Sequence, residues 1–360
     1  MRIARSCVFA FNSNMDLVAR PPLAEAERFF GGRITSGGER EIHVAEARRL
    51  HSAFEWEEVR MGGQAGNMAN AAAALGVRCL AHAYNLSPGQ RKLFPKGVEV
   101  SGRRTKAESR HYVLELVLRN GRRDRLIASH DPAHAELRIA RDFASRSTGF
   151  ISAGCGRAVA SGFHILNCDD AAGRLKAAAR LMRRWKAANP ALRIHFEAGD
   201  FARKAVLLDV VKTILPLVDS IGMNEKELCE FAAAFGIRER HGFEAARLLA
   251  EEIPEVVVHT ADYAFAYSRI RPVRTLESAL RLGHALSAHR AMTGGYAGLP
   301  DAENMIARKH PECRAGCGAA EEFVEAGFGR HGVLVPSFEI RPKLTVGLGD
   351  SFAAGCFLVE

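Results

Sequence analysis

The sequence contains no long apolar run. No stretch of its 360 residues approaches the roughly 20 consecutive apolar residues that cross a bilayer. The N-terminal run "CVFAF" is too short for the apolar core of a signal peptide, and polar residues follow it at once. We therefore expect a cytoplasmic protein without a membrane partner.

The eight cysteines lack the pattern of a disulfide framework. They are scattered among apolar residues, which is typical of reduced, mostly buried thiols. Cys313 and Cys317, with His310 near them, approach the spacing of metal ligands. They would supply only half of a zinc site, because no second pair of ligands lies nearby in the sequence, and we favour the interpretation as thiols.

The basic residues lack regular interleaving with aromatic side chains. The formal net charge of +9 comes largely from short arginine clusters such as residues 119–125 and 180–186. Proteins that bind single-stranded nucleic acid combine basic grooves with stacking aromatics. An anionic small-molecule substrate explains the charge as well as RNA does, and we expect no nucleic-acid partner.

Short apolar runs alternate with helical patterns along most of the chain. Strands are predicted at 7–11, 78–83, 163–167, 193–198, 220–224, 256–260 and 332–336, and helices over 64–75, 171–188, 203–214, 225–235 and 276–293. This order predicts parallel βαβ units, hence a three-layer α/β/α fold with a mostly parallel central sheet.

Two segments interrupt this alternation. Residues 17–60 are rich in charge and glycine, and residues 98–130 have the pattern of amphipathic strands around an Arg-rich turn. We predict that these two segments form a small β-rich lid, and that residues 1–16, 61–97 and 131–360 form the large domain. Ligands of such sheets bind outside the carboxyl ends of the strands, where a lid would exclude water.

The stretch "TVGLGDSFAAGCF" (345–357) combines a tight turn with the start of a helix. It predicts that Thr345 and Val346 end a strand, that residues 347–349 turn sharply, and that Asp350 lies at the start of a helix. Free backbone amides and the positive end of the helix dipole would together bind an anion. Asp350 beside them could act as a base, although aspartates at helix starts are often only caps.

Polar residues also follow several other predicted strands. Phosphoryl transfer needs such groups to hold an acceptor, to bind the moving phosphoryl group and to organise Mg²⁺ through water. The positions are Asn12, Asn14 and Asp16 after the first strand, the turn in "MGGQAGNMAN" (61–70), His195 and Glu197, and Asn224 and Glu227.

Several motifs occur together and in a characteristic order. They are "SGGERE", "EEVRMGGQAGNMANAAAALG", "ESRHYVLEL", "RDRLIAS", "IHFEAGD", "SIGMNEKEL", "VVHTADYA" and "KLTVGLGDSFAAGCF". In this order the chain resembles, over essentially its whole length, the ADP-dependent sugar kinases, the archaeal glucokinase and phosphofructokinase family of the ribokinase-like superfamily. The resemblance implies a ribokinase-like fold with a small lid, and transfer of the β-phosphate of ADP to a sugar hydroxyl.

The resemblance also implies roles for individual residues. Asp350 would be the base, the amides of Gly347, Leu348 and Gly349 the anion hole, and Arg125 a lid residue that reaches the nucleotide phosphates. The implied sugar-binding residues are Asn14, Asp16, Glu39, Gly62, Gly63, Gln64 and His111. The implied nucleotide-binding residues are Asn224, His259, Thr260 and Val346, and Glu197 and Glu227 would organise Mg²⁺.

The acceptor is the open point of this assignment. Members that accept glucose have a lid glutamate upstream of the Gly-Gly turn, and a gap-free count back from "RMGGQ" reaches Glu39. We therefore expect glucose, with ADP as donor and a monomer or small homo-oligomer. Fructose 6-phosphate or another sugar phosphate is the alternative, because the Arg-rich turn 119–125 could pair with a phosphate. A second alternative is a binding module that has lost catalysis.

The chain departs from the family pattern in places. Asp124 replaces the usual Asn before the lid arginine, the residues after the Glu of "HFEAGDF" differ, and the chain is shorter than is usual. These departures concern nucleotide selectivity and the placement of Mg²⁺ more than the class of reaction.

Overall fold

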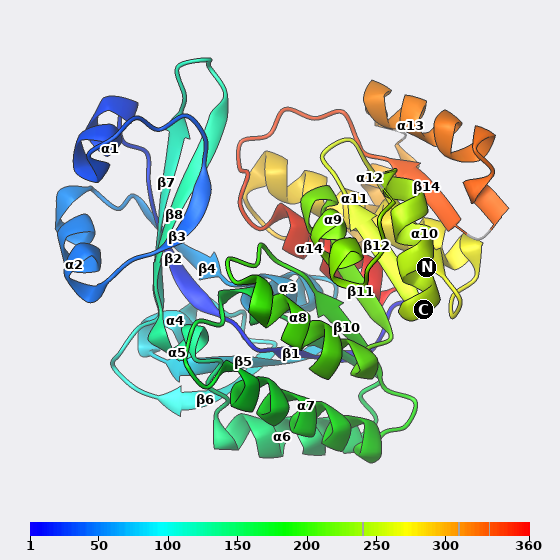
Figure 1. Ribbon diagram of the computed structural model, residues 1–360, viewed down its shortest axis with the longest axis horizontal. Coiled ribbons are helices and arrows are strands. Elements are labelled where there is room, and N and C mark those ends of the chain that lie inside the picture. The colour runs from blue at the N-terminus through cyan, green and yellow to red at the C-terminus, as the bar shows by residue number, and fades with distance from the viewer. Residues whose placement is uncertain (240, 309, 331) are drawn as a thin grey trace.

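The computed structural model describes residues 1–239, 241–308, 310–330 and 332–360, and these form two β-sheets with helices around them (Figure 1). The large sheet has the order β14 (Gly332–Pro336), β13 (Tyr263–Ser268), β12 (Glu255–His259), β11 (Ser220–Met223), β10 (Arg193–Glu197), β9 (Arg157–Ala160), β1 (Ser6–Ala10), β5 (Arg78–Leu86) and β6 (Val98–Arg104). Neighbouring strands from β6 to β12 pair in parallel, and β13 is antiparallel to both β12 and β14.

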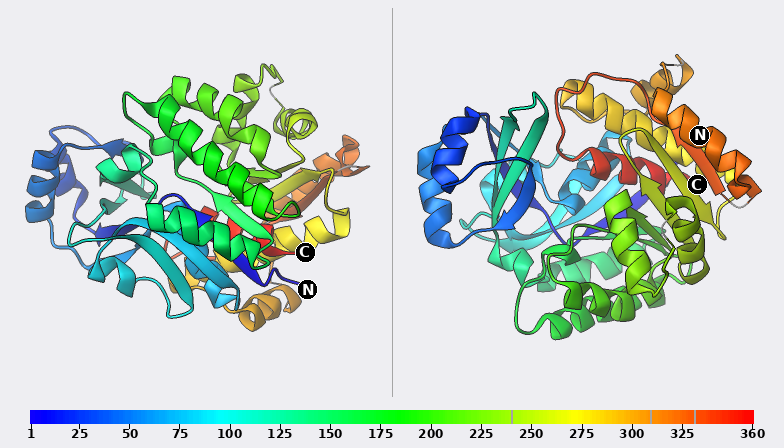
Figure 2. Two further views of the ribbon diagram at one scale, coloured as in Figure 1. Left: turned by 90° about the horizontal axis from the view of Figure 1, so that it is seen from below. Right: turned by 45° about the horizontal axis from the view of Figure 1, so that its top comes forward.

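Helices cover both faces of the large sheet (Figure 2). One apolar cluster lies beneath α6 (Arg141–Ser152), α7 (Ala171–Ala188), α8 (Lys204–Thr213), α9 (Glu225–Ala234) and α10 (Gly242–Glu252). The other lies beneath α3 (Gln64–Ala74), α11 (Val273–Thr293), α12 (Leu299–Ala307) and α14 (Leu348–Leu358). Strand β1 shows the alternation that produces this layering, because Val8 and Ala10 join the first cluster and Cys7 and Phe9 the second. The shorter elements are α4 (Pro88–Lys92), α5 (Pro132–Ala135), α13 (Arg314–Glu325), η1 (Phe163–Ile165), η2 (Leu215–Leu217) and η3 (Phe328–Arg330).

The small sheet lies beside the large one and carries its own core. Its order is β3 (Gly38–Glu41), β8 (Arg123–His130), β7 (Arg110–Val117), β2 (Asn14–Ala19) and β4 (Glu58–Gly62). Helices α1 (Leu23–Phe30) and α2 (Val44–Ala53) cover its outer face, where Leu50 and Leu114 are buried in a third apolar cluster (Figure 1).

Several sequence expectations were wrong at the level of elements. Strand β6, expected in the lid, pairs with β5 in the large sheet, whereas residues 14–16, expected in the large domain, begin strand β2 of the small sheet. Residues 163–165 form the 3₁₀ helix η1, and the strand lies earlier, at β9. Thr345 and Val346 do not end a strand. A local apolar period identifies an element but not the sheet that it joins.

The chain passes between the two sheets four times. The connections are β1 to β2, β4 to α3, β6 to β7 and β8 to α5. Functional side chains on the small sheet are therefore held close to the carboxyl ends of the parallel strands. Within the described ranges, no helix is both long enough and apolar enough to cross a membrane.

Candidate active site

Helix α14 begins in a left-handed turn with no side-chain cap. Gly347 has a φ of 70°, which favours glycine. A Cβ atom at Gly347 would also lie only 3.2 Å from Arg290 Nε and from Asn67 Nδ2. The amides of the first turn of a helix have no intrahelical acceptor, so the start of α14 leaves N–H groups free to interact with an anion.

Asp350 lies in the first turn of α14 and is half-buried. Burial, together with the negative charge of Glu197, raises the pKa of its carboxyl to about 6, while Asn67 and Arg290 oppose the shift. The side chain of Asn67 donates a hydrogen bond of 2.9 Å to Asp350 Oδ2. A carboxylate with this pKa is ionised at neutral pH and can accept a proton.

Three residues that sequence reasoning missed hold Asp350 in place. Asn67 Oδ1 accepts hydrogen bonds from Tyr296 Oη at 2.8 Å and from Arg290 Nη2 at 3.3 Å. The Arg290 guanidinium lies 4.1 Å from the centre of the Tyr296 ring. Asn67 lies within the "MGGQAGNMAN" motif, one turn after Gln64, so its spacing could have identified it. Arg290 gave a weaker signal, as a basic residue within a largely apolar helical pattern.

A cavity between the two sheets collects most of the predicted acceptor-binding residues. We call it the inter-sheet cavity; its lining includes Asp16, Glu39, Gly63, Gln64, His111, Arg125, Val346, Gly347 and Asp350, together with Asn12, Asn67, Ile127, His164 and Ile165. Residues from the small sheet therefore face the base across one cavity. Val346, expected beside the nucleotide, lines this cavity.

Asp16 lies at the floor of the inter-sheet cavity with its carboxylate fixed. Asn14 Nδ2 donates to Asp16 Oδ1 at 2.7 Å, and a Cβ atom at Gly62 would approach that same oxygen to 1.9 Å. Glycine at position 62 is therefore required for β4 to pass. Burial raises the pKa of Asp16 to about 7, with Glu39 and Asp350 adding to the rise and Asn14 opposing it.

The other predicted acceptor-binding residues differ in whether their polar atoms already have partners within the protein. Burial lowers the pKa of His111 to about 4, so the ring is neutral, and its buried Nε2 has no hydrogen-bond partner among the described residues. Gln64 is instead occupied, because its amide nitrogen donates to Ala198 O and its Oε1 accepts from Gly162 N at 3.0 Å. Glu39 is exposed on β3.

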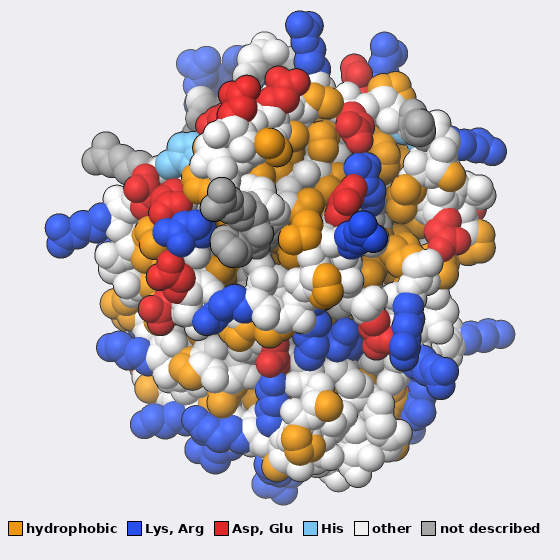
Figure 3. All heavy atoms as spheres, turned by 90° about the vertical axis from the view of Figure 1, so that its right-hand side faces the viewer, with side chains coloured by type: hydrophobic (Ala, Val, Ile, Leu, Met, Phe, Trp, Pro, Cys, Tyr) orange, Lys and Arg blue, Asp and Glu red, His pale blue; other side chains and the backbone are white. Residues whose placement is uncertain are grey.

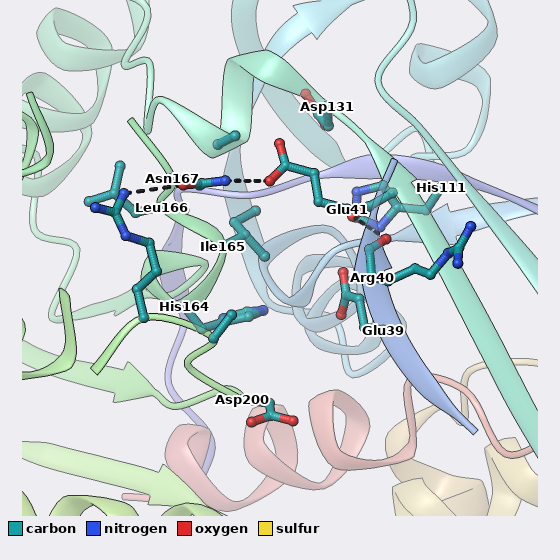
Figure 4. A pocket seen from close by; sticks show the side chains of 14 residues that line it. Glu39, Arg40, Glu41, His111, Asp131, His164, Ile165, Leu166, Asn167 and Asp200 are labelled. Atoms are coloured by element: carbon teal, nitrogen blue, oxygen red, sulfur yellow. Dashed lines mark hydrogen bonds between the residues drawn. The ribbon is translucent and has the colours of Figure 1, made fainter. Parts of the chain in front are cut away.

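A second pocket adjoins the inter-sheet cavity and shares Glu39, His111, His164 and Ile165 with it (Figure 4). Figure 4 shows the hydrogen bond across it between Asn167 and Glu41 on β3, and Arg203 donates to the same Asn167 side chain. The distances are 2.5 Å from Asn167 Nδ2 to Glu41 Oε2 and 3.1 Å from Arg203 Nη1 to Asn167 Oδ1. This chain joins the small sheet to the loops beside α7 and α8.

The predicted nucleotide-binding residues line a separate cavity at the edge of the large sheet. This sheet-edge cavity includes Asn224, His259, Thr260, Leu348, Gly349 and Arg125. Arg125 lines both cavities, and its Nη1 donates a hydrogen bond of 2.6 Å to Thr345 O in the segment before α14. The start of α14 therefore lies between the two cavities, with Arg125 from the small sheet bridging them.

Asp124, which replaces the usual Asn before Arg125, connects β8 to the residue directly before β3. Its Oδ2 accepts from Gly37 N at 2.8 Å and pairs with Arg122 Nη2 at 2.7 Å. The replacement thus supports the backbone that carries Arg125.

Glu197 and Glu227 are buried below the sheet-edge cavity, and both already have protein partners. Glu197 Oε2 lies 2.9 Å from His195 Nε2, and Glu227 Oε2 accepts from Asn224 N at 2.9 Å in a capping box. Burial raises the pKa of Glu227 to about 7, and Glu197 and Asp200 add to the rise. Because both carboxylates already have protein partners, a divalent cation near them would contact them through water, as Mg²⁺ commonly does.

Direct metal ligation has no support in the described residues, which contain no group of three or more His, Cys, Asp or Glu able to hold an ion. Cys313 Sγ instead donates to Asp262 Oδ1 at 3.2 Å, and Cys313 lines the sheet-edge cavity.

Comparisons with known proteins identify the family and the fold. Residues 33–359 match the family described as ADP-specific Phosphofructokinase/Glucokinase conserved region. An ADP-dependent glucose/glucosamine kinase from Pyrococcus abyssi is 26% identical over 365 residues, covering 89% of this chain and 79% of the relative. An ADP-specific phosphofructokinase from Pyrococcus horikoshii is 27% identical over 194 residues, covering 46% of this chain and 42% of the relative.

Solved structures share the fold. A phosphofructokinase from Pyrococcus horikoshii, solved with AMP, superposes with a TM-score of 0.81 at 21% identity, covering 99% of this chain and 97% of that one. An adenosine kinase from Sinorhizobium meliloti superposes with a TM-score of 0.54 at 16% identity, covering 77% and 84%. The predicted ribokinase-like α/β/α fold is confirmed.

Proposed function

The chain belongs to the ADP-specific phosphofructokinase/glucokinase family, and from this premise we propose that it transfers the β-phosphate of ADP to a hydroxyl group of glucose, with AMP as the second product. ADP-dependent phosphotransfer to a sugar is the reaction of its relatives. The observation that carries the proposal is the position of Asp350 and the start of α14 between the inter-sheet cavity and the sheet-edge cavity.

Each cavity has a separate task in this reaction. The acceptor occupies the inter-sheet cavity, where Asp16 accepts hydrogen bonds from its hydroxyl groups and His111 offers a free ring nitrogen. Asp350 takes the proton of the reacting hydroxyl as the phosphoryl group arrives. The amides of Gly347, Leu348 and Gly349 hold the phosphoryl oxygens, which carry the negative charge.

The nucleotide occupies the sheet-edge cavity beside Asn224, His259 and Thr260. Arg125 lies between its phosphates and the acceptor, and the guanidinium neutralises charge on the transferred group. Glu197 and Glu227 would hold Mg²⁺ through water, and the ion would offset the charge of the phosphate oxygens. We assign the protein to the cytoplasm, as a monomer or small homo-oligomer, on family membership.

The acceptor assignment depends on Glu39. Its carboxylate lines the inter-sheet cavity and can accept a hydrogen bond from a glucose hydroxyl, whereas it would repel a sugar phosphate. A relative whose match covers 89% of this chain is named for glucose and glucosamine, which supports the same choice.

A sugar phosphate is the second candidate. Arg40 and Arg203 line the adjoining pocket, and either could pair with a phosphate group. The turn 119–125 is a weaker candidate. Arg40 and Arg119 both form ion pairs, with Glu46 and Glu27, but Arg119 lines neither the adjoining pocket nor the inter-sheet cavity.

A polyanion partner has less support than either small molecule. On the face shown in Figure 3, basic side chains are dispersed among acidic and apolar ones and do not gather into a stripe. Binding of nucleic acid through phosphates favours clustered basic residues.

The test is to measure kcat/KM for glucose and for fructose 6-phosphate in the native protein and in Glu39→Ala. We expect the native protein to prefer glucose. Because Glu39 is exposed, the substitution should lower kcat/KM for glucose roughly tenfold, a loss of about 1.5 kcal/mol. It should leave kcat/KM for fructose 6-phosphate unchanged or raise it. Glu57→Ala is the matched control, because it removes a lid carboxylate that pairs with Arg20 and lines none of the three cavities described above. A native preference for fructose 6-phosphate would contradict the proposal and favour Arg40 and Arg203.

A further inference from the structure

A buried polar cluster joins three of the segments that pass between the two sheets. Ser13 lies between β1 and β2, Ser109 directly before β7, and Asp131 directly after β8. Ser109 Oγ donates to Asp131 Oδ1 at 3.1 Å, and Ser13 N donates to His134 Nε2 at 3.3 Å. His134 Nδ1 lies 2.5 Å from Asp131 Oδ2, which closes the cluster. All four residues are buried.

These contacts fix which nitrogen of the His134 ring accepts a hydrogen bond. A backbone N–H group can only donate, so Nε2 of His134 must accept and carries no hydrogen. The other ring nitrogen, Nδ1, faces Asp131.

His82 supports the same segment in the same way. Ala140 N donates to His82 Nε2 at 3.2 Å, so His82 Nδ1 carries the hydrogen and donates to Phe11 O at 2.7 Å. Burial lowers the pKa of His82 to about 4, which keeps this arrangement at neutral pH. Ser13 Oγ also donates to His82 O at 2.8 Å. The connection from β1 to β2 is thus held from both sides.

The cluster fixes the positions at which β2 and β7 begin, and these two strands carry acceptor-binding residues. Met15 N donates to Ser109 O at 2.8 Å, which joins the start of β2 to the start of β7. In the register that follows, Asp16 pairs with His111. Asp131 and His111 both line the pocket of Figure 4. A shift of Ser13 or Ser109 would therefore move Asp16 and His111 relative to Asp350, which lies on helix α14 beside the large sheet.

We propose that His134 and Asp131 are positioning residues for the acceptor: through Ser13 and Ser109 they hold Asp16 and His111 at the correct distance from Asp350. This inference rests on the proposed function, because it concerns the same acceptor site. The residues of the sheet-edge cavity, apart from Arg125, lie on the large-sheet side. Loss of a contact in the cluster should therefore weaken binding of the acceptor and leave binding of the nucleotide unchanged.

The experiment compares His134→Leu with His134→Gln. Leucine removes the acceptor for Ser13 N, whereas the Oε1 of glutamine can replace it. We expect His134→Leu to raise the KM for glucose at least tenfold and to leave the Kd for AMP, measured without sugar, within twofold of the native value. His134→Gln should return the glucose KM to within threefold.

The control is Ser147→Ala, which removes a buried acceptor from Trp185 Nε1 (2.9 Å) in the α6–α7 layer. It should lower Tm without changing the glucose KM or the AMP Kd. The inference is wrong if His134→Leu only lowers Tm and the active fraction, or if it raises the glucose KM and the AMP Kd by similar factors.

Ser109→Ala covers the case in which His134→Leu does not fold. It removes one bond to Asp131 and should raise the glucose KM about threefold with the AMP Kd unchanged; an unchanged glucose KM would refute the inference. The proposed function fails separately, if the native protein forms no AMP from ADP and any sugar.

Discussion

Asn67→Asp tests how the structure sets the protonation of the base. The substitution keeps the size of the side chain, and the new carboxylate can still accept from Tyr296 and Arg290. It removes the hydrogen bond to Asp350 Oδ2 and places a negative charge 2.9 Å away from that oxygen. Both effects disfavour ionised Asp350, so the pKa must rise.

The size of the rise follows from the bond that is lost. A hydrogen bond to a charged group contributes about 1.5–3 kcal/mol, which corresponds to roughly one to two pKa units. The pKa of Asp350 should therefore move from about 6 to the range of about 7–8. Because a base acts only when ionised, activity should fall near pH 6 by roughly tenfold or more and return at high pH.

The assay is kcat/KM for glucose between pH 5 and pH 9. The acid limb of the variant should be displaced to higher pH, with activity at pH 9 within threefold of the native protein. Asn70→Asp is the matched control, because Asn70 is equally buried on the same helix but donates to Leu93 O. An unshifted limb, or a loss that persists at pH 9, would refute the assignment of Asp350 as the titrating base.

Three further changes test other parts of the site. Asp350→Ala should lower kcat by about 10²–10⁴-fold while calorimetry still detects glucose binding, and near-native turnover would remove Asp350 from the mechanism. Gly347→Ala should cost about 1–2 kcal/mol of backbone strain and lower kcat by displacing Arg290, and an unchanged kcat with normal Tm would count against the left-handed turn as part of the site. Asp16→Asn should remove a titration near pH 7 from the glucose KM, in which binding weakens as the pH falls and Asp16 is protonated; a native pH profile in this variant would exclude Asp16 as the group that binds the hydroxyls.

Much of the fold could be predicted because its signals are local. Helix α7 lies at residues 171–188 as predicted, and strand β14 at 332–336. Strand β9 was missed because "RAVA" is short and its small residues suggested close packing of helices. Strand β6 was assigned to the wrong sheet because its pairing with β5 depends on tertiary packing, which the local sequence does not show.

The site shows the same limit. Asp350 and the glycines before it have a sequence pattern that follows directly from the chemistry of anion binding. Arg290 and Tyr296 have no such pattern, because they act through Asn67, which comes from a helix more than 200 positions away. The exposure of Glu39 was also beyond sequence reasoning, since it depends on how β3 lies against β8.

Side-by-side turnover of glucose with ADP and with ATP, at saturating Mg²⁺, tests the central claim most directly. Chromatography of the nucleotide products separates AMP formed from ADP from ADP formed from ATP. We predict that ADP supports rapid formation of sugar phosphate and AMP, that ATP is a poor donor, and that Asp350→Ala lowers the rate with ADP by about 10²–10⁴-fold. A clear preference for ATP, or AMP formation at a near-native rate in Asp350→Ala, would contradict these expectations.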